Sequence, residues 1–361
     1  MSQATDDGRP APQEFEKVLT GATATVAQFE EQRLTFIQRL QRFLHVYPTT
    51  VPFVVLLLGL VLGVAVNPVR FTAASNLSTI LTQVMVVGIV GVGQTLVILT
   101  AGIDLSVGVI MVISSVVMGR LAVLDGVPTI FAFPIGLLCG AAFGLLNGAL
   151  VTRLKMPPFI VTLGTLSIIG ALNTFYSQSE TIGMQDIQDK ANFLQIMGNQ
   201  VELGSARIMW GTFLMLAVAA VVWYILNRTS FGRHIYATGD DPEAARLAGI
   251  DTDKVLLSVY VLAGLIAAVA GWALIGRVGA ISPTAGENAN LDSITAVVIG
   301  GTSLFGGRGS IVGTVIGALI VGVFRSAVSL AGLDVLWQEF AIGVLIIIAV
   351  ALDQWIRRVA K

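Results

Sequence analysis

The amino-acid sequence predicts an all-α integral membrane protein with about ten transmembrane helices. Of its 361 residues, 55% are hydrophobic and the mean hydropathy is +0.84. Only 12% are charged, whereas soluble domains carry about 25%. Apolar stretches of about 20 residues, the length that crosses a bilayer as a helix, recur along the chain. Most side chains are therefore expected to face lipid or other apolar helices.

The first 49 residues are expected to form a cytoplasmic tail. This segment is polar and acidic at its start and lacks the basic-then-apolar layout of a cleaved signal peptide. Its later part, 29–47, spaces Ile37, Leu40 and Leu44 by three and four residues, with arginines between them. This pattern is typical of an amphipathic helix on the inner membrane surface. A simple lead-in to the first span is the alternative.

Ten apolar segments within residues 50–356, the expected transmembrane domain, are candidate spans. They cover residues 50–66, 77–99, 104–123, 128–151, 158–177, 209–227, 254–276, 292–305, 309–330 and 335–356. The eighth is short and rich in glycine, which favours a broken helix. Such a segment is expected inside the bundle, because non-helical backbone at membrane depth must be covered by protein or water.

Lysine and arginine residues near the span ends predict that both termini are cytoplasmic. With the N-terminus inside, the basic connections after the fourth and sixth spans and the C-terminal residues 357–361 all fall on the cytoplasmic side. This agrees with the excess of positive charge found in cytoplasmic loops. The longest internal loop is then 228–253, and the longest external loop is about 178–208.

Features recur at an offset of five spans, which predicts an inverted repeat. Glycines at steps of four lie in the fourth span, at Gly136, Gly140, Gly144 and Gly148, and in the ninth, at Gly309, Gly313 and Gly317. Such stripes let helix backbones approach closely. The third and eighth spans begin with similar acidic turns, at Asp104 and Asp292. Inverted repeats are common in transporters, with the pathway at the repeat interface.

The sequence contains no catalytic or metal-binding motif. It has no GxxxxGK[ST] phosphate loop, no Ser/His/Asp set and no Cys/His cluster, and its single cysteine is Cys139. The net charge of -1 provides no basic field for nucleic acid. We therefore expect no cofactor, no bound metal and no enzymatic activity. Uphill transport would need an ion gradient or a separate ATPase subunit.

The internal loop 228–253 contains a short helix with both ends specified. The segment of interest comprises Asp241, Pro242, Glu243, Ala244, Ala245, Arg246 and Gly249. Asp241 is the expected N-cap, Pro242 the first helical residue and Gly249 the C-terminal stop. Its alanines predict a smooth surface that another protein could approach closely. An ordinary surface helix between two spans is the alternative.

Four blocks in order resemble the permeases of ribose-, xylose-, arabinose- and fructose-type ABC importers. They read GQTLVILTAGIDLSVG (93–108), NGALVTRLKMPPFIVTLGT (147–165), FGRHIYATGDDPEAARLAGI (231–250) and AVVIGGTSLFGGRGSIVGTVIGALI (296–320). The resemblance covers roughly residues 75–356. Within the family, the chain looks most similar to the fructose-type permeases of alpha-proteobacteria.

The resemblance implies a permease subunit of the bacterial inner membrane, with ten spans and a fold similar to that of the cobalamin importers. Such permeases pair as homodimers in the lipid bilayer, with a cytoplasmic ABC ATPase below and a periplasmic sugar-binding protein above. Residues 240–250 match the loop that seats on the ATPase. The implied function is ATP-driven import of a monosaccharide of the fructose or ribose class.

A sugar path needs hydrogen-bonding groups spaced along apolar helices. The candidates are Gln83, Gln94, Asn147, Thr165, Asn173 and Arg325. Hydrogen bonding between helices is the competing explanation for each of them. Asp104 and Asp292 lie at span starts, where a structural role as a helix cap is the expected one.

Two other classes of function compete with the importer subunit. A self-contained carrier or channel would usually bury several ionisable groups in the membrane. The predicted spans hold few such groups, with Arg325 as the main exception, which argues against a proton or sodium relay. A membrane scaffold without a transport role does not explain the glycine-lined helices.

Overall fold

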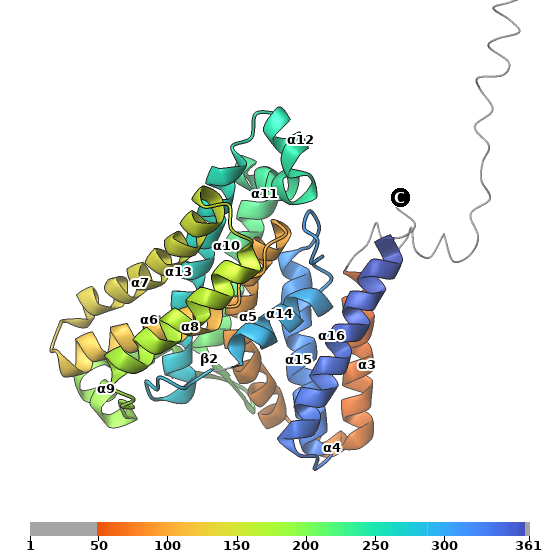
Figure 1. The fold of residues 1–361 in the computed structure, drawn as a ribbon. Helices are drawn as coiled ribbons and strands as arrows, with labels where there is room; N and C mark the ends of the chain where they lie inside the picture. The colour runs from red at the N-terminus through yellow and green to blue at the C-terminus, as the bar shows by residue number, and fades with distance from the viewer. Residues whose placement is uncertain (1–48, 287, 358–361) are drawn as a thin grey trace, which may run out of the picture.

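The computed structural model describes residues 49–286 and 288–357 as a helical bundle with one short β-hairpin (Figure 1). The amphipathic helix expected over 29–47, and residues 358–361, lie outside the described residues. The elements are α3 (Thr50–Val66), α4 (Pro68–Phe71), α5 (Ala74–Leu99), α6 (Val107–Gly119), η1 (Arg120–Leu124), α7 (Thr129–Arg153), α8 (Pro158–Ser177), α9 (Met184–Ala191), η2 (Asn192–Gly198), β1 (Gln200–Leu203), β2 (Ala206–Met209), α10 (Trp210–Arg228), α11 (Ser230–Asp240), α12 (Pro242–Leu247), α13 (Thr252–Val278), α14 (Ala289–Ile299), α15 (Ile311–Leu330) and α16 (Val335–Arg357).

Within the described part of the chain, 7 helices are long and apolar enough to cross a membrane. They are α5, α6 continued through η1, α7, α8, α10, α13 and α15. The apolar helix α3 has 17 residues and is shorter than this limit. The predicted helical, membrane-embedded class is confirmed at this level.

The eighth predicted span, 292–305, is broken, as its glycines favour. Helix α14 has only 11 residues, and the chain continues to residue 310 without regular helix. Gly301, Gly306 and Gly307 take positive φ angles there, a conformation that glycine adopts at little cost and that a helix cannot contain. The ninth span is correspondingly shorter than predicted, because Gly309 lies in the turn before α15.

Two non-helical segments meet inside the bundle. Residues 100–106 lead into α6, and residues 280–286 and 288 precede α14, so each helix begins after an irregular stretch. The Asn290 side chain at the start of α14 donates from Nδ2 to the Leu105 carbonyl at 3.2 Å. Gly108, in the first turn of α6, lies against the backbone of Asn290. The starts of α6 and α14 therefore touch.

Helix α8 satisfies part of this irregular backbone. Thr162 Oγ1 donates to the Ile103 carbonyl at 3.0 Å, and Asn173 Nδ2 donates to the Pro283 carbonyl at 2.9 Å. Both acceptors belong to non-helical segments. Such bonds matter because an unpaired carbonyl away from water costs free energy.

The predicted glycine stripe of α7 packs directly on α13. A Cβ on Gly144 would overlap the Tyr260 carbonyl, and a Cβ on Gly140 would lie 2.5 Å from the Gly264 carbonyl. Helix α15 packs on α14 through glycine in the same way, with Gly317 against the Ala296 carbonyl. In both pairs the backbones touch, as small residues in membrane helices allow.

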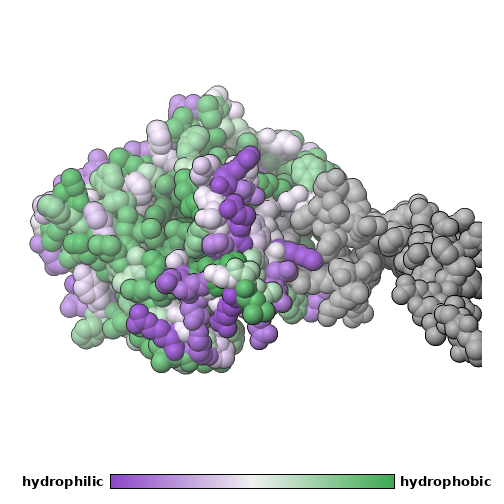
Figure 2. Space-filling model, turned by 90° about the horizontal axis from the view of Figure 1, so that it is seen from above, coloured by the Kyte–Doolittle hydropathy of each residue, from purple (hydrophilic) through white to green (hydrophobic). Residues whose placement is uncertain are grey.

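The two ends of the bundle differ. Helix α12 projects at the upper end of Figure 1, whereas α9 and the β1–β2 hairpin lie at the lower end. Figure 2 looks onto the α12 end and shows hydrophilic residues over the middle of this face, with hydrophobic residues around much of its rim. We refer to these two ends as the α12 end and the hairpin end.

The α7–α13 contact predicts a sharp difference between two glycines. Gly144→Ala should destabilise the protein by about 1–3 kcal/mol, because its Cβ has no room beside the Tyr260 carbonyl. Gly170→Ala in α8 should be neutral or stabilising, since nothing lies within 4 Å of its Cβ and alanine favours helix. Unfolding in detergent micelles measures both. An equal loss of stability in the Gly144→Ala and Gly170→Ala variants would contradict this packing.

Candidate functional site

One face of α5 is polar over its first half. Its side chains recur at steps of three and four, which places them on one side of the helix. They are Ser75, Ser78, Thr79, Thr82 and Gln83. They line a cavity of about 650 Å³ together with Gln200, Ser205 and Arg207 of the hairpin region and Arg277 near the end of α13. This outer cavity therefore lies at the hairpin end.

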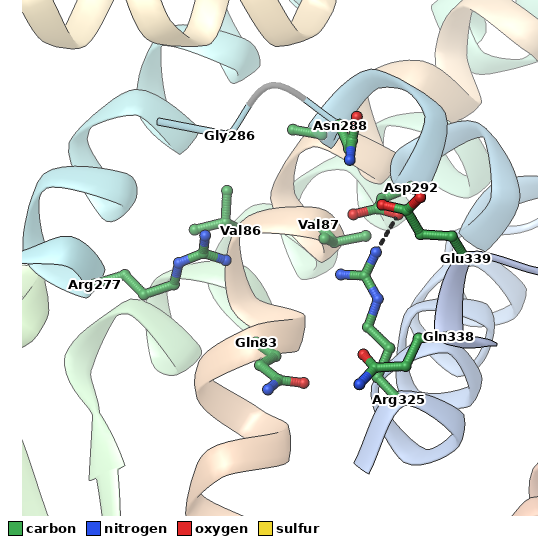
Figure 3. A pocket seen from close by; sticks show the side chains of 11 residues that line it. Gln83, Val86, Val87, Arg277, Gly286, Asn288, Asp292, Arg325, Gln338 and Glu339 are labelled. Atoms are coloured by element: carbon green, nitrogen blue, oxygen red, sulfur yellow. Dashed lines mark hydrogen bonds and ion pairs between the residues drawn. The ribbon is translucent and has the colours of Figure 1, made fainter. Parts of the chain in front are cut away.

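A second cavity has a volume of about 400 Å³, and Figure 3 shows its lining. Gln83 and Arg277 line both cavities, so the two lie next to each other. The remaining walls of this inner cavity come from α5, α14, the segment before α14, α15 and the start of α16. They are Val86, Val87, Gly286, Asn288, Ala289, Asp292, Arg325, Gln338 and Glu339.

An ion pair between α14 and α15 forms one wall of the inner cavity. Arg325 donates from a terminal guanidinium nitrogen to Asp292 Oδ1 at 2.7 Å. Asp292 is only 8% exposed, and breaking such a pair would leave an uncompensated charge in a poorly solvated place. The helix-cap role expected for Asp292 is wrong, because it lies inside the first turn of α14 and pairs with α15 instead.

Arg277 faces this pair from the other side of the inner cavity. Figure 3 shows its side chain pointing into the cavity, with no hydrogen bond or ion pair to the other residues drawn. The Gln83 Oε1 atom is buried and has no hydrogen-bond partner among the described residues. The cavity therefore presents guanidinium donors that a polar solute could use.

The inner cavity is closed towards the α12 end. Val86 and Val87 line it, and every residue of α5 from 84 to 99 is buried. Thr95 and Thr314 hydroxyls share a hydrogen bond of 2.6 Å, which joins α5 to α15 in this closed part. The described conformation is therefore hollow at the hairpin end and sealed at the α12 end.

Three other predicted residues lie in the closed part, away from both cavities. Asn147 donates from Nδ2 to Ser106 Oγ at 2.8 Å, and Ser106 in turn donates its N–H and hydroxyl to Asp104 Oδ1 at 2.8 and 2.6 Å. Asp104 thus organises the start of α6. Gln94 is fully buried, and neither of its amide atoms has a partner among the described residues.

The two candidates on α8 make structural contacts. Thr165 Oγ1 donates to the Thr162 carbonyl at 3.3 Å, and Asn173 holds Pro283 as described above. Among the six predicted path residues, only Gln83 and Arg325 line the inner cavity. The polar face of α5 from Ser75 to Thr82 was missed, although its spacing is visible in the sequence.

Helix α12 has the predicted ends. Asp241 Oδ1 accepts hydrogen bonds from the N–H groups of Glu243 and Ala244 at 2.9 and 3.0 Å, and Pro242 is the first helical residue. Gly249 has φ +85°, the left-handed conformation expected of a C-terminal stop. The local sequence therefore determines where this helix begins and ends.

The exposed surface of α12 includes Ala244 and Ala248 as expected, but not Ala245. Ala245 is 4% exposed and packs against the protein, so it cannot contribute to an outer contact surface. Leu247 is instead 91% exposed. Leu247 is therefore the large apolar side chain that α12 presents at its surface.

Polar contacts fasten α12 to the start of α13. Arg246 Nε donates to Thr252 Oγ1 at 2.7 Å, and its guanidinium pairs with Asp253 at 3.5 Å rather than with Glu243. Lys155 also pairs with Asp253. Nearby, the side-chain hydrogen bond with Lys254 holds the pKa of Asp251 below its ordinary value.

Comparisons with known proteins agree with this architecture. The Fructose import permease protein FrcC of Rhizobium meliloti is 53% identical over 360 residues, covering 100% of both chains. The Ribose import permease protein RbsC of Bacillus subtilis is 39% identical, over 84% of this chain and 92% of its own. The Galactose/methyl galactoside import permease protein MglC of Escherichia coli is 36% identical, over 83% and 92%. No solved structure matches the chain significantly.

The family model described as the permease component of a branched-chain amino acid transport system matches residues 76–350, which is most of the described bundle. This match covers both cavities, helix α12 and the broken helix α14. The chain therefore belongs to this family of transport permeases and is a membrane transport subunit rather than an enzyme.

Proposed function

We propose that this chain is the transmembrane subunit of an ABC importer that carries a monosaccharide of the fructose or ribose class into the cytoplasm. The relatives support the substrate class, since they are named as fructose, ribose and galactose import permeases. The observation that carries the proposal is the polar path formed by the outer and inner cavities. A separate ATPase supplies the energy, and this chain carries no cofactor.

The chemistry of the two cavities suits a sugar. Serine and threonine hydroxyls line the outer cavity and can exchange hydrogen bonds with a polyol at each step. In the inner cavity, Gln83, Arg277 and Arg325 offer an amide and two guanidinium groups around one volume. A solute held by several moderate hydrogen bonds can still leave, which transport requires.

The hairpin end is proposed to face the periplasm and the α12 end the cytoplasm. This orientation follows the distribution of lysine and arginine and places both termini inside. The periplasmic sugar-binding protein would then deliver its ligand at the outer cavity. The described conformation would be the outward-open state of an alternating-access cycle.

The proposed architecture is a ten-span subunit with an inverted repeat, similar to the cobalamin-importer permeases, acting as a homodimer. Supporting this, α6 and α14 occupy corresponding places in the two predicted halves, and both begin after irregular backbone. The glycine stripes of α7 and α15 correspond in the same way. Residues 1–49, 50–356 and 357–361 are proposed as tail, permease domain and cytoplasmic C-terminus.

Helix α12 is proposed as the element that seats on the ATPase. Its exposed Leu247 is the apolar side chain available for a partner. The capping by Asp241 and the anchoring by Arg246 hold the helix in a defined position on α13. A fixed helix with one projecting side chain can pass on a movement of its partner.

Blocking the outer cavity should stop uptake. In a Cys139→Ser background, Thr82→Cys treated with a bulky, membrane-impermeant thiol reagent should lose sugar uptake, because the adduct fills the cavity. Leu77→Cys is the matched control, since Leu77 is on the same helix, is 50% exposed and lies outside both cavities. Uptake in proteoliposomes containing the ATPase and the binding protein is the readout. Full activity after complete modification at position 82 would contradict the path.

The orientation can be measured with two exposed positions. Asp189→Cys in α9 and Glu243→Cys in α12 lie at opposite ends of the bundle and are accessible. In intact spheroplasts the impermeant reagent should label position 189 alone, and permeabilisation should add position 243. Labelling of position 243 in intact spheroplasts would reverse the orientation.

Loss of Leu247 should weaken ATPase binding. Replacing it with aspartate removes an apolar contact worth about 2 kcal/mol, which corresponds to more than about tenfold in the dissociation constant. Ala248→Ser, at an exposed neighbour with a small side chain, should bind normally. Co-purification and ATPase titration against the reconstituted permease measure the difference. Unchanged affinity in Leu247→Asp would exclude α12 as the principal seat.

A further inference from the structure

The end of α11 makes an unusual three-way backbone contact. Gly239 is the penultimate residue of α11, two positions before the N-cap of α12. A Cβ on Gly239 would overlap the Leu99 carbonyl at the end of α5 and would lie 2.8 Å from the Gly307 nitrogen in the α14–α15 turn. The Gly307 N–H itself donates to the Leu99 carbonyl at 2.9 Å. We call this contact of Gly239, Leu99 and Gly307 the junction.

Glycine is required on both sides of the junction. Gly306 and Gly307 have φ angles of +81° and +70°. A Cβ on Gly306 would lie 2.5 Å from the Gly239 carbonyl, and a Cβ on Gly307 would lie 2.9 Å from Asp240 Cα. Three separate segments thus meet backbone to backbone, with no flexible side chain between them. Such a contact transmits displacement, because packed protein interiors are hardly compressible.

A side-chain hydrogen bond ties α11 to the same turn. The Tyr236 hydroxyl donates to the Gly309 carbonyl at 2.9 Å, one turn of helix before Gly239. Burial raises the pKa of Tyr236, so the hydroxyl stays protonated and available as a donor. Helix α11 therefore holds the α14–α15 turn at two points.

The junction lies between α12 and the helices that close the inner cavity at the α12 end. The Leu99 end of α5 closes the path at the α12 end, and the α14–α15 turn joins the two helices that carry Asp292 and Arg325. Gly300 and Gly313 pack backbone to backbone, so α14 and α15 move together at this end. The Thr95–Thr314 hydrogen bond adds α5 to the same unit.

We infer that Gly239 is a positioning residue for coupling: the junction passes the movement of α12 to α5 and to the α14–α15 pair as one rigid unit. The unit comprises the elements that seal the inner cavity at the α12 end. Its displacement opens that seal and shifts the wall formed by Asp292 and Arg325. This inference rests on the proposed function, in which an ATPase moves α12.

The test uses nucleotide-dependent access to the outer cavity. The permease carries Cys139→Ser and the reporter Thr82→Cys and is reconstituted with its ATPase subunit. In this parent, a non-hydrolysable ATP analogue should change the rate at which an impermeant thiol reagent labels position 82. Adding Gly239→Ala should leave the ATPase bound but abolish the nucleotide-dependent change, since the extra Cβ separates α11 from α5 and the turn. Gly164→Ala, whose Cβ has nothing within 4 Å, is the matched control and should respond like the parent.

A second measurement leaves all junction glycines in place. Spin labels at Arg233→Cys in α11 and Phe305→Cys in the α14–α15 turn should keep their distance when the nucleotide analogue binds. The distance from position 233 to a label at Met184→Cys in α9, at the hairpin end, should change. This measurement tests the rigid unit even if the Gly239→Ala variant does not assemble with the ATPase.

The outcomes separate the two claims. If the protein carrying Cys139→Ser alone, with Thr82 intact, shows no ATP-driven uptake, the proposed function fails. If the parent responds and Gly239→Ala responds equally, or if the 233–305 distance changes with nucleotide, the junction is not a rigid coupling unit and the inference is overturned.

Discussion

Irregular backbone inside a membrane protein must be covered, and this constraint explains much of the bundle. The segments before α6 and α14 have carbonyl groups outside regular helix, and the bundle must supply hydrogen-bond partners wherever water does not reach them. Side chains of α8 and Asn290 supply hydrogen bonds to three of these carbonyls. The surrounding helices must therefore approach closely, which accounts for the glycine faces of α7 and α15 and for the complete burial of the second half of α5.

Close backbone packing also determines where a solute can enter. Where glycine faces meet, the helix backbones touch and leave no room for a solute. The outer and inner cavities lie beside the polar first half of α5. The Asp292–Arg325 pair lies at the boundary between the inner cavity and the closely packed helices next to it. A movement of α14 against its surroundings would change this boundary, which is the step that alternating access requires.

Sequence reasoning succeeded where the physical cause is local. The ends of α12 follow from Asp241, Pro242 and Gly249, and a break in the eighth span follows from its glycines. The residues of the candidate site could not be predicted in this way, because contacts between distant segments bring them together. The Asp292 partner lies 33 residues away on another helix, and the inward position of Ala245 reflects the anchoring of Arg246 to Thr252 and Asp253. Arg277 could not be recognised as a cavity residue from the sequence, because its position near a span end does not reveal the cavity beside it. The stripe on α5 was predictable, because its spacing is purely helical.

The central claim is that the sugar passes through the outer and inner cavities of each subunit, alongside α5. The most direct measurement is an electron cryomicroscopy structure of the permease with its ATPase, its binding protein and a bound sugar, trapped before hydrolysis. The account predicts sugar density in the inner cavity, within hydrogen-bond distance of Gln83, Arg277 or Arg325. Sugar density on another route, with both cavities empty of sugar and closed throughout the cycle, would contradict it.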